Sequence, residues 1–257
     1  MPWRLMQVDF GRTAEDYARY RGELPAGLLG RLERFEIGRP GQRVLDLGTG
    51  TGVFARAFAA QGAEVVGLDR SAEMLDQARA IEGPKVDYVE ASAERTLLDQ
   101  KSFDVVSVAE AWHWFDRPKV MREIKRVLKP AGRLVIVYDE WLPLRDNAVQ
   151  ATEKLIESYN PDWKLGGGTG LHPTTLTDVR AAGFVEIESF SFDDDVSFSH
   201  EAWRGRVRAS AGVLASLSAG EVARFDEKLR RTLEERFADE PLDIPFCVWA
   251  VVARAPG

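Results

Sequence analysis

The chain has 257 residues, of which 45% are hydrophobic and 29% are charged, a balance that excludes a disordered or fibrous protein. This length suits one large α/β domain, and we expect residues 1–257 to form a single domain. The formal net charge of −7 lacks the basic footprint that nucleic-acid-binding proteins usually carry. Nucleic acid is therefore not an expected partner.

Cysteine content and hydropathy exclude further classes of protein. The one cysteine, Cys247, can form no intrachain disulfide and no cysteine-rich zinc site, and we expect it to be a buried apolar residue in a strand and no metal to be bound. The first residues, MPWRLMQVDFGRTAED, contain no apolar run of signal-peptide length. No stretch approaches the roughly 20 apolar residues of a membrane helix. We therefore expect a cytoplasmic protein with no membrane partner, and a monomer or a homodimer.

Strands and helices alternate through the first half of the chain. Thr13 begins a predicted polar helix, and a second is predicted over 24–35. Helices are then predicted over 53–61, from the N-cap Ser71, and over 120–128. The strands predicted between them are Arg43–Leu47, Glu64–Leu68, Val86–Val89, Phe103–Val108 and Gly132–Tyr138. Such alternation predicts a parallel sheet with helices on both faces.

The pattern changes after residue 139. Two more strands are predicted over 184–192 and 246–253, and a Gly/Pro-rich loop over 160–173. Helices are predicted over 148–159, 175–182, 199–211 and 218–237, the last with Ser218 and Glu221 in capping-box spacing. The expected fold is α/β, with a doubly wound, seven-stranded, mostly parallel sheet and a helical lid. Residues 1–37 would form N-terminal lid helices, 38–139 a cofactor-binding core, and 140–257 lid insertions plus the last two strands.

The segment VLDLGTGTG, residues 44–52, is the strongest local signal for a ligand site. Glycines at the end of a buried strand let the backbone turn sharply and approach a ligand, and the helix that follows offers free N–H groups to an anion. By itself such a turn fits any nucleotide site, or only a tight turn. The spacing is G-x-G-x-G, whereas a dinucleotide fingerprint is G-x-G-x-x-G, which disfavours a nicotinamide cofactor.

Asp69 follows the second predicted strand directly. In doubly wound folds, this position faces the ribose of a bound nucleoside. A carboxylate there can accept hydrogen bonds from the ribose hydroxyls. The alternative is a residue that caps the next helix, and the two roles are compatible.

Four segments together resemble the class I S-adenosylmethionine-dependent methyltransferases of the menaquinone/ubiquinone-methylase-like (methyltransferase type 11) group. They are DLGTGTG, EVVGLD with SAEMLDQAR, SFDVVSVAEAWHWFD and RVLKPAGRLVIV. The resemblance covers roughly residues 9–139, half of the chain, and AWHWFD is further similar to the trans-aconitate methyltransferase-like branch. It implies a Rossmann-like methyltransferase fold, S-adenosylmethionine as the cofactor and a small-molecule methyl acceptor.

The resemblance also implies the residues that would bind this cofactor. The methionine end would lie along Asp46, Gly48, Thr49, Gly50 and Gly52. The ribose and adenine would lie at Asp69, Arg70, Met74, Ser92, Ala93 and Glu94, where Ser92 replaces the aspartate of many relatives. Ala109 and Glu110 would approach the amino group of the cofactor. Near the N-terminus the family often shows YxxYR, which Tyr17, Tyr20 and Arg21 match; Tyr17 and Arg21 would contact the cofactor and Tyr20 the substrate.

His113 is the expected general base, since it follows the fourth strand, where doubly wound sheets place ligands. Trp112 and Trp114 would wall a pocket for a flat or apolar substrate, with His172 of the Gly-rich loop as a further contact. The alternatives are a structural histidine and aromatic rings that pack beneath the lid. A base is needed only if the acceptor atom carries a proton of high pKa.

Two other functions compete with methyl transfer. A protein that binds S-adenosylmethionine without catalysis would keep the same binding residues. A nicotinamide-dependent oxidoreductase would require G-x-G-x-x-G and a Tyr/Lys pair after the fourth strand, and the sequence has neither. The methyl group could be accepted by an oxygen, nitrogen or carbon atom, and the sequence favours none of the three.

Overall fold

Two compact units make up the chain, and the computed structural model describes residues 9–21 and 24–256. The core unit comprises Glu23–Asp139, Leu171–Phe192 and Val248–Gly257. The helical unit comprises Met1–Gly22, Glu140–Gly170 and Asp193–Cys247. A single domain whose N-terminal lid segment ends at residue 37 was predicted, whereas the first segment of the helical unit ends at residue 22.

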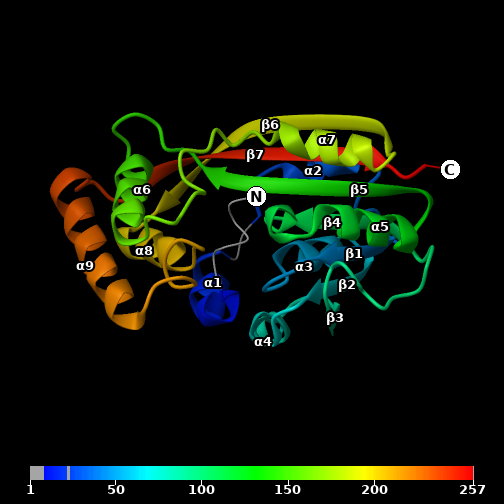
Figure 1. Ribbon diagram of the computed structural model, residues 1–257, viewed down its shortest axis with the longest axis horizontal. Helices are drawn as coiled ribbons and strands as arrows, with labels where there is room; N and C mark the ends of the chain where they lie inside the picture. Colours follow the sequence, from blue (N-terminus) through cyan, green and yellow to red (C-terminus); the bar gives the residue numbers. More distant parts are fainter. Residues whose placement is uncertain (1–8, 22–23, 257) are drawn as a thin grey trace. The chain divides into compact units, whose positions relative to one another are not determined.

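A single seven-stranded sheet has the strand order β3-β2-β1-β4-β5-β7-β6 (Figure 1). The strands are β1 (Arg43–Leu47), β2 (Glu64–Asp69), β3 (Asp87–Glu90), β4 (Phe103–Ala109), β5 (Leu128–Trp141), β6 (Val185–Phe198) and β7 (Leu242–Arg254). Strand β1 pairs in parallel with β2 and β4, β2 with β3, and β4 with β5. The chain order reverses direction between β1 and β4, the place where such sheets bind ligands beyond the carboxyl ends of their strands.

Both faces of the sheet are covered within the core unit, which confirms the doubly wound arrangement. Neighbouring strand residues point to opposite faces, so Val44 enters one buried cluster and Leu45 the other. The helices are α2 (Leu28–Glu33), α3 (Val53–Ala60), α4 (Ala72–Ala80), η3 (Trp112–Trp114), α5 (Arg117–Val127) and α7 (Pro173–Ala181). Helices α2 and α3 pack in the cluster with Val44, and α5 and α7 in the cluster with Leu45.

Helix α2 differs from its prediction in both length and place. It begins after Gly27, whose φ of 74° ends the preceding turn, and not at Leu24. Leu28 and Leu32 are completely buried in the same cluster as Val44 and Phe58. This helix therefore belongs to the core unit and is not a lid helix.

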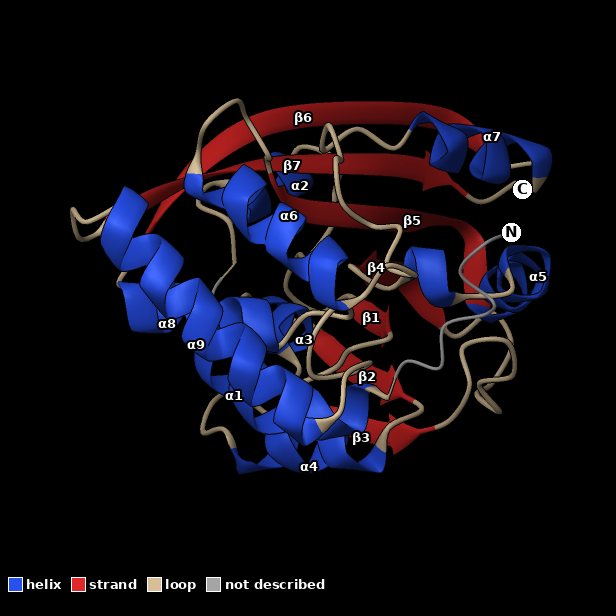
Figure 2. Cartoon of the chain, turned by 60° about the vertical axis from the view of Figure 1, so that its left-hand side comes forward, coloured by secondary structure: helices blue, strands red, loops and turns tan. Residues whose placement is uncertain are grey.

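The helical unit consists mainly of helices (Figure 2) and has a hydrophobic cluster of its own. Its helices are η2 (Phe10–Thr13), α1 (Ala14–Tyr20), α6 (Ala148–Tyr159), α8 (His200–Arg208) and α9 (Ala219–Arg236). The predicted stripe on α9 is buried at Val222, Phe225, Leu229 and Leu233. Ser218 and Glu221 form the predicted capping box. Within the described ranges, none of the helices is both long and apolar enough to span a membrane.

Candidate functional site

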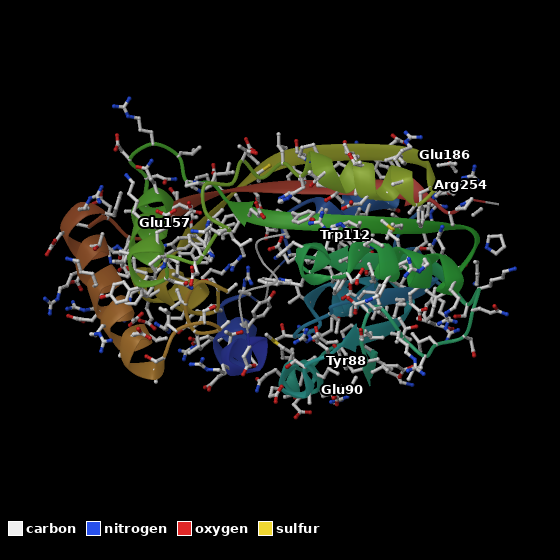
Figure 3. All side chains as sticks on the ribbon, viewed as in Figure 1. Tyr88, Glu90, Trp112, Glu157, Glu186 and Arg254 are labelled. Carbon is white, nitrogen blue, oxygen red and sulfur yellow. The ribbon has the colours of Figure 1, made fainter. Side chains whose placement is uncertain are left out.

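A row of side chains on neighbouring strands lies beneath the glycine loop. Asp46 on β1 is in register with Gly67 on β2 and Ser107 on β4, and Gly67 with Tyr88 on β3 (Figure 3 labels Tyr88). Register partners on adjacent strands point to the same face. Gly67 carries no side chain, and a Cβ there would lie 2.9 Å from the ring of Tyr88. The Tyr88 ring therefore occupies the space above Gly67.

Asp46 supports the glycine loop from within the core. Its side chain is only 1% exposed; one oxygen accepts from the Thr49 hydroxyl at 2.7 Å and the other from the Ser107 hydroxyl at 2.6 Å. Desolvation by burial raises the pKa of Asp46 to about 6, and the nearby charge of Asp69 adds to this effect. Asp46 is buried and both of its oxygens are bonded internally, so it orients the glycine loop from within the core.

Three glycines give the loop its shape. Gly48, Gly50 and Gly52 have φ values of 69°, 54° and 79°, a region that residues with a Cβ rarely adopt. A Cβ on Gly48 would lie 2.5 Å from the Cβ of Ala111, and one on Gly52 would lie 2.2 Å from the Tyr88 hydroxyl. The loop is thus enclosed by the segment after β4 and by β3.

Asp69 holds two loops together at the carboxyl end of β2. One oxygen accepts from the backbone N–H of Gly50 at 2.9 Å, and the other from that of Ser71 at 3.0 Å. Ser71 caps α4 by accepting from the N–H of Met74, as the sequence predicted. A carboxylate has about four lone-pair positions, so two remain for other donors. The capping and ribose-binding roles are therefore compatible in the structure.

The segment predicted at the adenine edge is tied to the start of α5. The Ser92 hydroxyl donates to the Glu94 carboxylate, and the other Glu94 oxygen accepts from the N–H of Asp116 at 3.0 Å. Ala93 and Met74 are 5% and 3% exposed, whereas the side chain of Arg70 is exposed. These residues offer apolar and polar groups close to the end of β2 and β3.

Glu110 is held in an unusual backbone conformation directly after Ala109, the last residue of β4. Its φ is 55°, its N–H donates to the carbonyl of Val137, and its carboxylate accepts from the N–H of Asp139 at 2.6 Å. Left-handed backbone at a residue other than glycine costs about 1–3 kcal/mol and is concentrated at functional sites. The side chain is therefore fixed at the carboxyl ends of β4 and β5.

Tyr138 brings two of the predicted site histidines to one aromatic ring. The His172 imidazole stacks on Tyr138 with ring centroids 3.6 Å apart and planes at 8°, and His113 stacks on it at 6.2 Å and 24°. The Tyr138 hydroxyl is within 3.2 Å of the Thr175 hydroxyl on α7. Tyr138 was not among the predicted site residues. The available signal was a polar aromatic residue near the end of an apolar strand.

The two tryptophans that flank His113 differ in burial. Trp112 is fully buried, its indole N–H donates to Asp178 at 3.2 Å, and its ring meets Phe115 edge to face. It packs in the core, so the structure corrects its predicted role as a substrate contact. Trp114 is half-buried and lies 4.7 Å from His113, ring to ring.

The N-terminal residues belong to the helical unit. Tyr17, Tyr20 and Arg21 are half-buried on or beside α1, and the Arg21 guanidinium lies over the Tyr17 ring at 4.5 Å. Their predicted contacts with cofactor and substrate stay predictions. His200 begins α8, as its sequence position indicated, and its ring bonds to the carbonyl of Phe237.

Comparison with known proteins supplies the family. Residues 45–136 match the family described as a methyltransferase domain. An uncharacterized methyltransferase of Schizosaccharomyces pombe is 30% identical over 200 residues, which cover 74% of this chain and 75% of that protein. The chain belongs to this methyltransferase family.

Other methyltransferases are similar over shorter stretches. A demethylmenaquinone methyltransferase of Clavibacter sepedonicus is 41% identical over 174 residues, 58% of this chain and 67% of that protein. The chain spans about half the length of an uncharacterized methyltransferase of Mycobacterium tuberculosis, with 38% identity over 136 residues, 53% of this chain and 54% of that protein. The predicted menaquinone-methylase-like resemblance is thereby confirmed.

A solved structure shares the fold of this chain. The phosphoethanolamine N-methyltransferase 2 of Haemonchus contortus, solved with S-adenosylhomocysteine, has a TM-score of 0.56 and 22% identity, covering 95% of this chain and 57% of that one. This likeness confirms the predicted Rossmann-like methyltransferase fold.

The Asp46 carboxyl predicts a pH-dependent stability. Because its folded pKa of about 6 lies above the ordinary 3.8, the folded state holds this proton more tightly, and stability falls as pH rises between these values. At 1.36 kcal/mol for each pKa unit, the total is about 3 kcal/mol. Urea unfolding of wild type and Asp46→Asn from pH 4 to 7 should show the wild type losing stability relative to the variant.

Asp76→Asn is the matched control, since Asp76 is exposed on α4. Its stability should run parallel to that of the wild type across this pH range. Parallel curves for Asp46→Asn as well would contradict the raised pKa of Asp46.

The stack on Tyr138 predicts a nuclear magnetic resonance signature. A stacked aromatic ring shields the protons above it, so Tyr138→Leu should move the His172 imidazole C–H resonances downfield. Loss of the aromatic contact should also lower stability by about 0.5–1.5 kcal/mol beyond the change in buried area.

The chain has three histidines, so the resonances can be assigned by replacing each in turn. Tyr138→Phe keeps the ring and loses only the hydroxyl, and should leave the His172 resonances in place. The His200 resonances should stay unchanged in both variants. An unshifted His172 in Tyr138→Leu would refute the stack.

Proposed function

We propose that this protein is an S-adenosylmethionine-dependent methyltransferase that moves a methyl group to a small molecule. The observation that carries the proposal is the junction of Asp69 and the glycine loop at the carboxyl end of β2. Membership of the methyltransferase family supports the reaction type and gives the oxidoreductase alternative no support. The name of the relative from Clavibacter sepedonicus states a small-molecule acceptor, which supports that substrate class.

The residues at this site fit the proposed cofactor. The left-handed glycines leave the loop backbone bare where a ligand would approach. The Thr51 hydroxyl is 1% exposed and has no hydrogen-bond partner in the described structure, so it is a polar group available to a ligand in the loop itself. Buried polar groups without a partner are rare in folded proteins and usually have a functional explanation.

Each part of the site would hold a different part of the cofactor. Gly48, Gly50 and Gly52, with Thr49 placed by Asp46, would bind the methionine end, and Glu110 beside Ala109 its amino group. Asp69 would accept hydrogen bonds from the two ribose hydroxyls through its remaining lone pairs. Apolar surface from Met74 and Ala93, with Arg70, Ser92 and Glu94 beside it, would receive the adenine.

Direct displacement needs little from the protein beyond alignment. When bound, the cofactor would supply a methyl group already activated by a positively charged sulfur. Orientation alone can contribute effective molarities of roughly 10⁵–10⁸ M. Where the acceptor atom carries a proton, an imidazole nitrogen of His113 would take it, with the ring oriented by Tyr138. His172 and Trp114 would contact the acceptor. The predicted contact of Tyr20 with the substrate stays a prediction, as do a cytoplasmic location, a monomer or homodimer and the lack of a metal.

The cofactor assignment is tested by calorimetric titration with S-adenosylhomocysteine, the proposed product, with NADH as a comparison ligand. Each charge-assisted hydrogen bond contributes roughly 1.5–3 kcal/mol. Asp69→Ala should therefore weaken binding of S-adenosylhomocysteine on the order of 10²-fold, since it removes the ribose contact and loosens the loop. The wild type should not bind NADH.

Asp76→Ala removes an exposed carboxylate of α4 that pairs with Arg79, and should bind like the wild type. Circular dichroism of each variant checks that it is folded. NADH binding without S-adenosylhomocysteine binding in the wild type would refute the proposal and restore the oxidoreductase.

A further inference from the structure

The segment that carries His113 follows β4 and has little regular structure of its own. Helix η3 is three residues long, and in it the N–H of Trp114 donates to the carbonyl of Ala111 at 3.0 Å. The next bond, from the N–H of Phe115 to the carbonyl of Trp112, is longer at 3.4 Å. Short 3₁₀ helices have poor hydrogen-bond geometry. The direction of the His113 ring therefore depends on contacts with the rest of the core unit.

One side of this segment is anchored in the core. Residues three apart in a 3₁₀ helix lie on the same side, and Trp112 and Phe115 have this spacing. Trp112, labelled in Figure 3, is fully buried, and its ring meets that of Phe115 edge to face at 6.3 Å. His113 lies on another side of the turn and is half-buried beside the ring of Tyr138. The placement of the Trp112 and Phe115 pair thus sets where the His113 ring points.

Helix α7 presents one face to the same region. His172, Thr175 and Asp178 follow one another at intervals of three residues, so they share a face of the helix. The first two contact Tyr138, by ring stacking and between hydroxyls respectively. The third reaches the His113 segment at Trp112. One short helix therefore contacts both the ring beside His113 and the residue that precedes His113.

Asp178 holds the His113 segment at both ends. Its Oδ2 accepts from the indole N–H of Trp112 at 3.2 Å and from the guanidinium of Arg117 at 3.0 Å. Arg117 begins α5, and the side chains of Arg117 and Asp178 are only 22% and 26% exposed. A buried indole N–H needs an acceptor, and a hydrogen bond to a charged acceptor is about twice as strong as one between neutral groups. The Asp178 carboxylate is therefore a strong anchor for Trp112.

A second anchor is independent of Asp178. The carboxylate of Glu94 accepts from the backbone N–H of Asp116 at 3.0 Å, directly before α5. This bond fixes the later end of the segment, where the predicted adenine edge lies. Loss of Asp178 should therefore release Trp112 and leave the start of α5 and the Glu94 contact in place.

We propose that Asp178 is a positioning residue that fixes the direction of the His113 imidazole by holding Trp112. The inference rests on the proposed function, in which His113 takes a proton from the methyl acceptor. Such a transfer needs the base within about 2.6–3.2 Å of the group that it deprotonates. A misplacement of about 1 Å can lower a rate on the order of 10²-fold. Asp178 supplies alignment through Trp112, without contact with the acceptor.

The test is nuclear magnetic resonance of the full chain, recorded without S-adenosylhomocysteine. Wild type should show cross-peaks between the ring protons of His113 and Tyr138. Asp178→Ala should lose these cross-peaks, shift the His113 C–H resonances and move the Trp112 indole N–H upfield, because the indole loses its acceptor. The cross-peaks between His172 and Tyr138 should remain, since the stack at the start of α7 does not involve Asp178.

Two further variants test the route through Trp112. Asp178→Asn keeps an oxygen that can accept from the indole and should restore the wild-type His113 signals. Trp112→Phe keeps a ring but has no N–H, so it should reproduce the His113 changes of Asp178→Ala while the Arg117 ion pair stays intact. It also assigns the Trp112 indole resonance.

Val179→Ala is the matched control for a merely structural effect. Val179 is fully buried on α7 directly after Asp178, so its truncation should lower the urea midpoint of unfolding. The acceptor for the Trp112 indole is kept, and the His113 signals should therefore match those of the wild type.

Calorimetry with S-adenosylhomocysteine separates this inference from the cofactor assignment. Asp178→Ala should bind it as tightly as the wild type does, because the Glu94 contact is kept. Since the spectra are recorded without this ligand, failure of the wild type to bind it would overturn the cofactor assignment and leave the result on His113 standing.

Four outcomes would overturn the proposal. In the first, Asp178→Ala keeps the cross-peaks between His113 and Tyr138. In the second, Val179→Ala loses them as well, so that Asp178 only supports the helix. In the third, Asp178→Asn behaves like Asp178→Ala, which would assign the effect to the ion pair. In the fourth, Asp178→Ala weakens binding of S-adenosylhomocysteine, which would assign Asp178 to the cofactor site.

Discussion

The buried carboxylate of Asp46 joins the three elements on which the candidate cofactor site depends. It bonds β1, where it lies, to the hydroxyl of Thr49 in the glycine loop and to the hydroxyl of Ser107 on β4. A carboxyl group this deep is costly to ionise, which explains its raised pKa and its two internal donors. Removing either donor would leave a buried acceptor unsatisfied, so the loop conformation and the strand pair are energetically coupled.

The loops that follow the strands contact one another above Asp46. Gly48 lies against Ala111, Gly50 donates to Asp69, and Gly52 lies beneath the Tyr88 hydroxyl. Each contact needs a residue without a Cβ or with left-handed backbone. The G-x-G-x-G spacing therefore serves internal packing as much as ligand approach. The same glycines that would bind the cofactor also close the loops, because both roles require close contact with the backbone.

The sequence predicted the core unit well because its signals are local. Strand β1 has the predicted bounds, and the cap at Ser71 is as expected. A strand was predicted over 184–192, whereas β6 covers Val185–Phe198 and its alternation of exposure continues through Asp193–Asp195, residues that are unusual in strands. Charged residues are tolerated there because β6 is at the edge of the sheet.

Contacts between distant segments were not readable from the sequence. Tyr138 stacks with His113 and His172, which are 25 and 34 positions away, and no periodicity links them. Trp112 was expected to face a substrate because it neighbours His113, but its indole N–H finds Asp178 on α7. Burial of a large side chain is decided by tertiary packing, which residue type and neighbours along the chain do not specify.

Arg206 shows how far local patterns extend and where they end. Arg204 and Arg208 are four positions apart on α8, so they share a face, and both pair with Asp226. The rings that lie beside Arg206 come from strands far away in the chain, Trp141 at the end of β5 and Phe246 within β7. Methyl transfer by displacement places few demands on residue chemistry, so one cofactor site serves many acceptors. Residues that meet only in the folded chain, as Arg206 does with Trp141 and Phe246, are the ones that a motif search passes over.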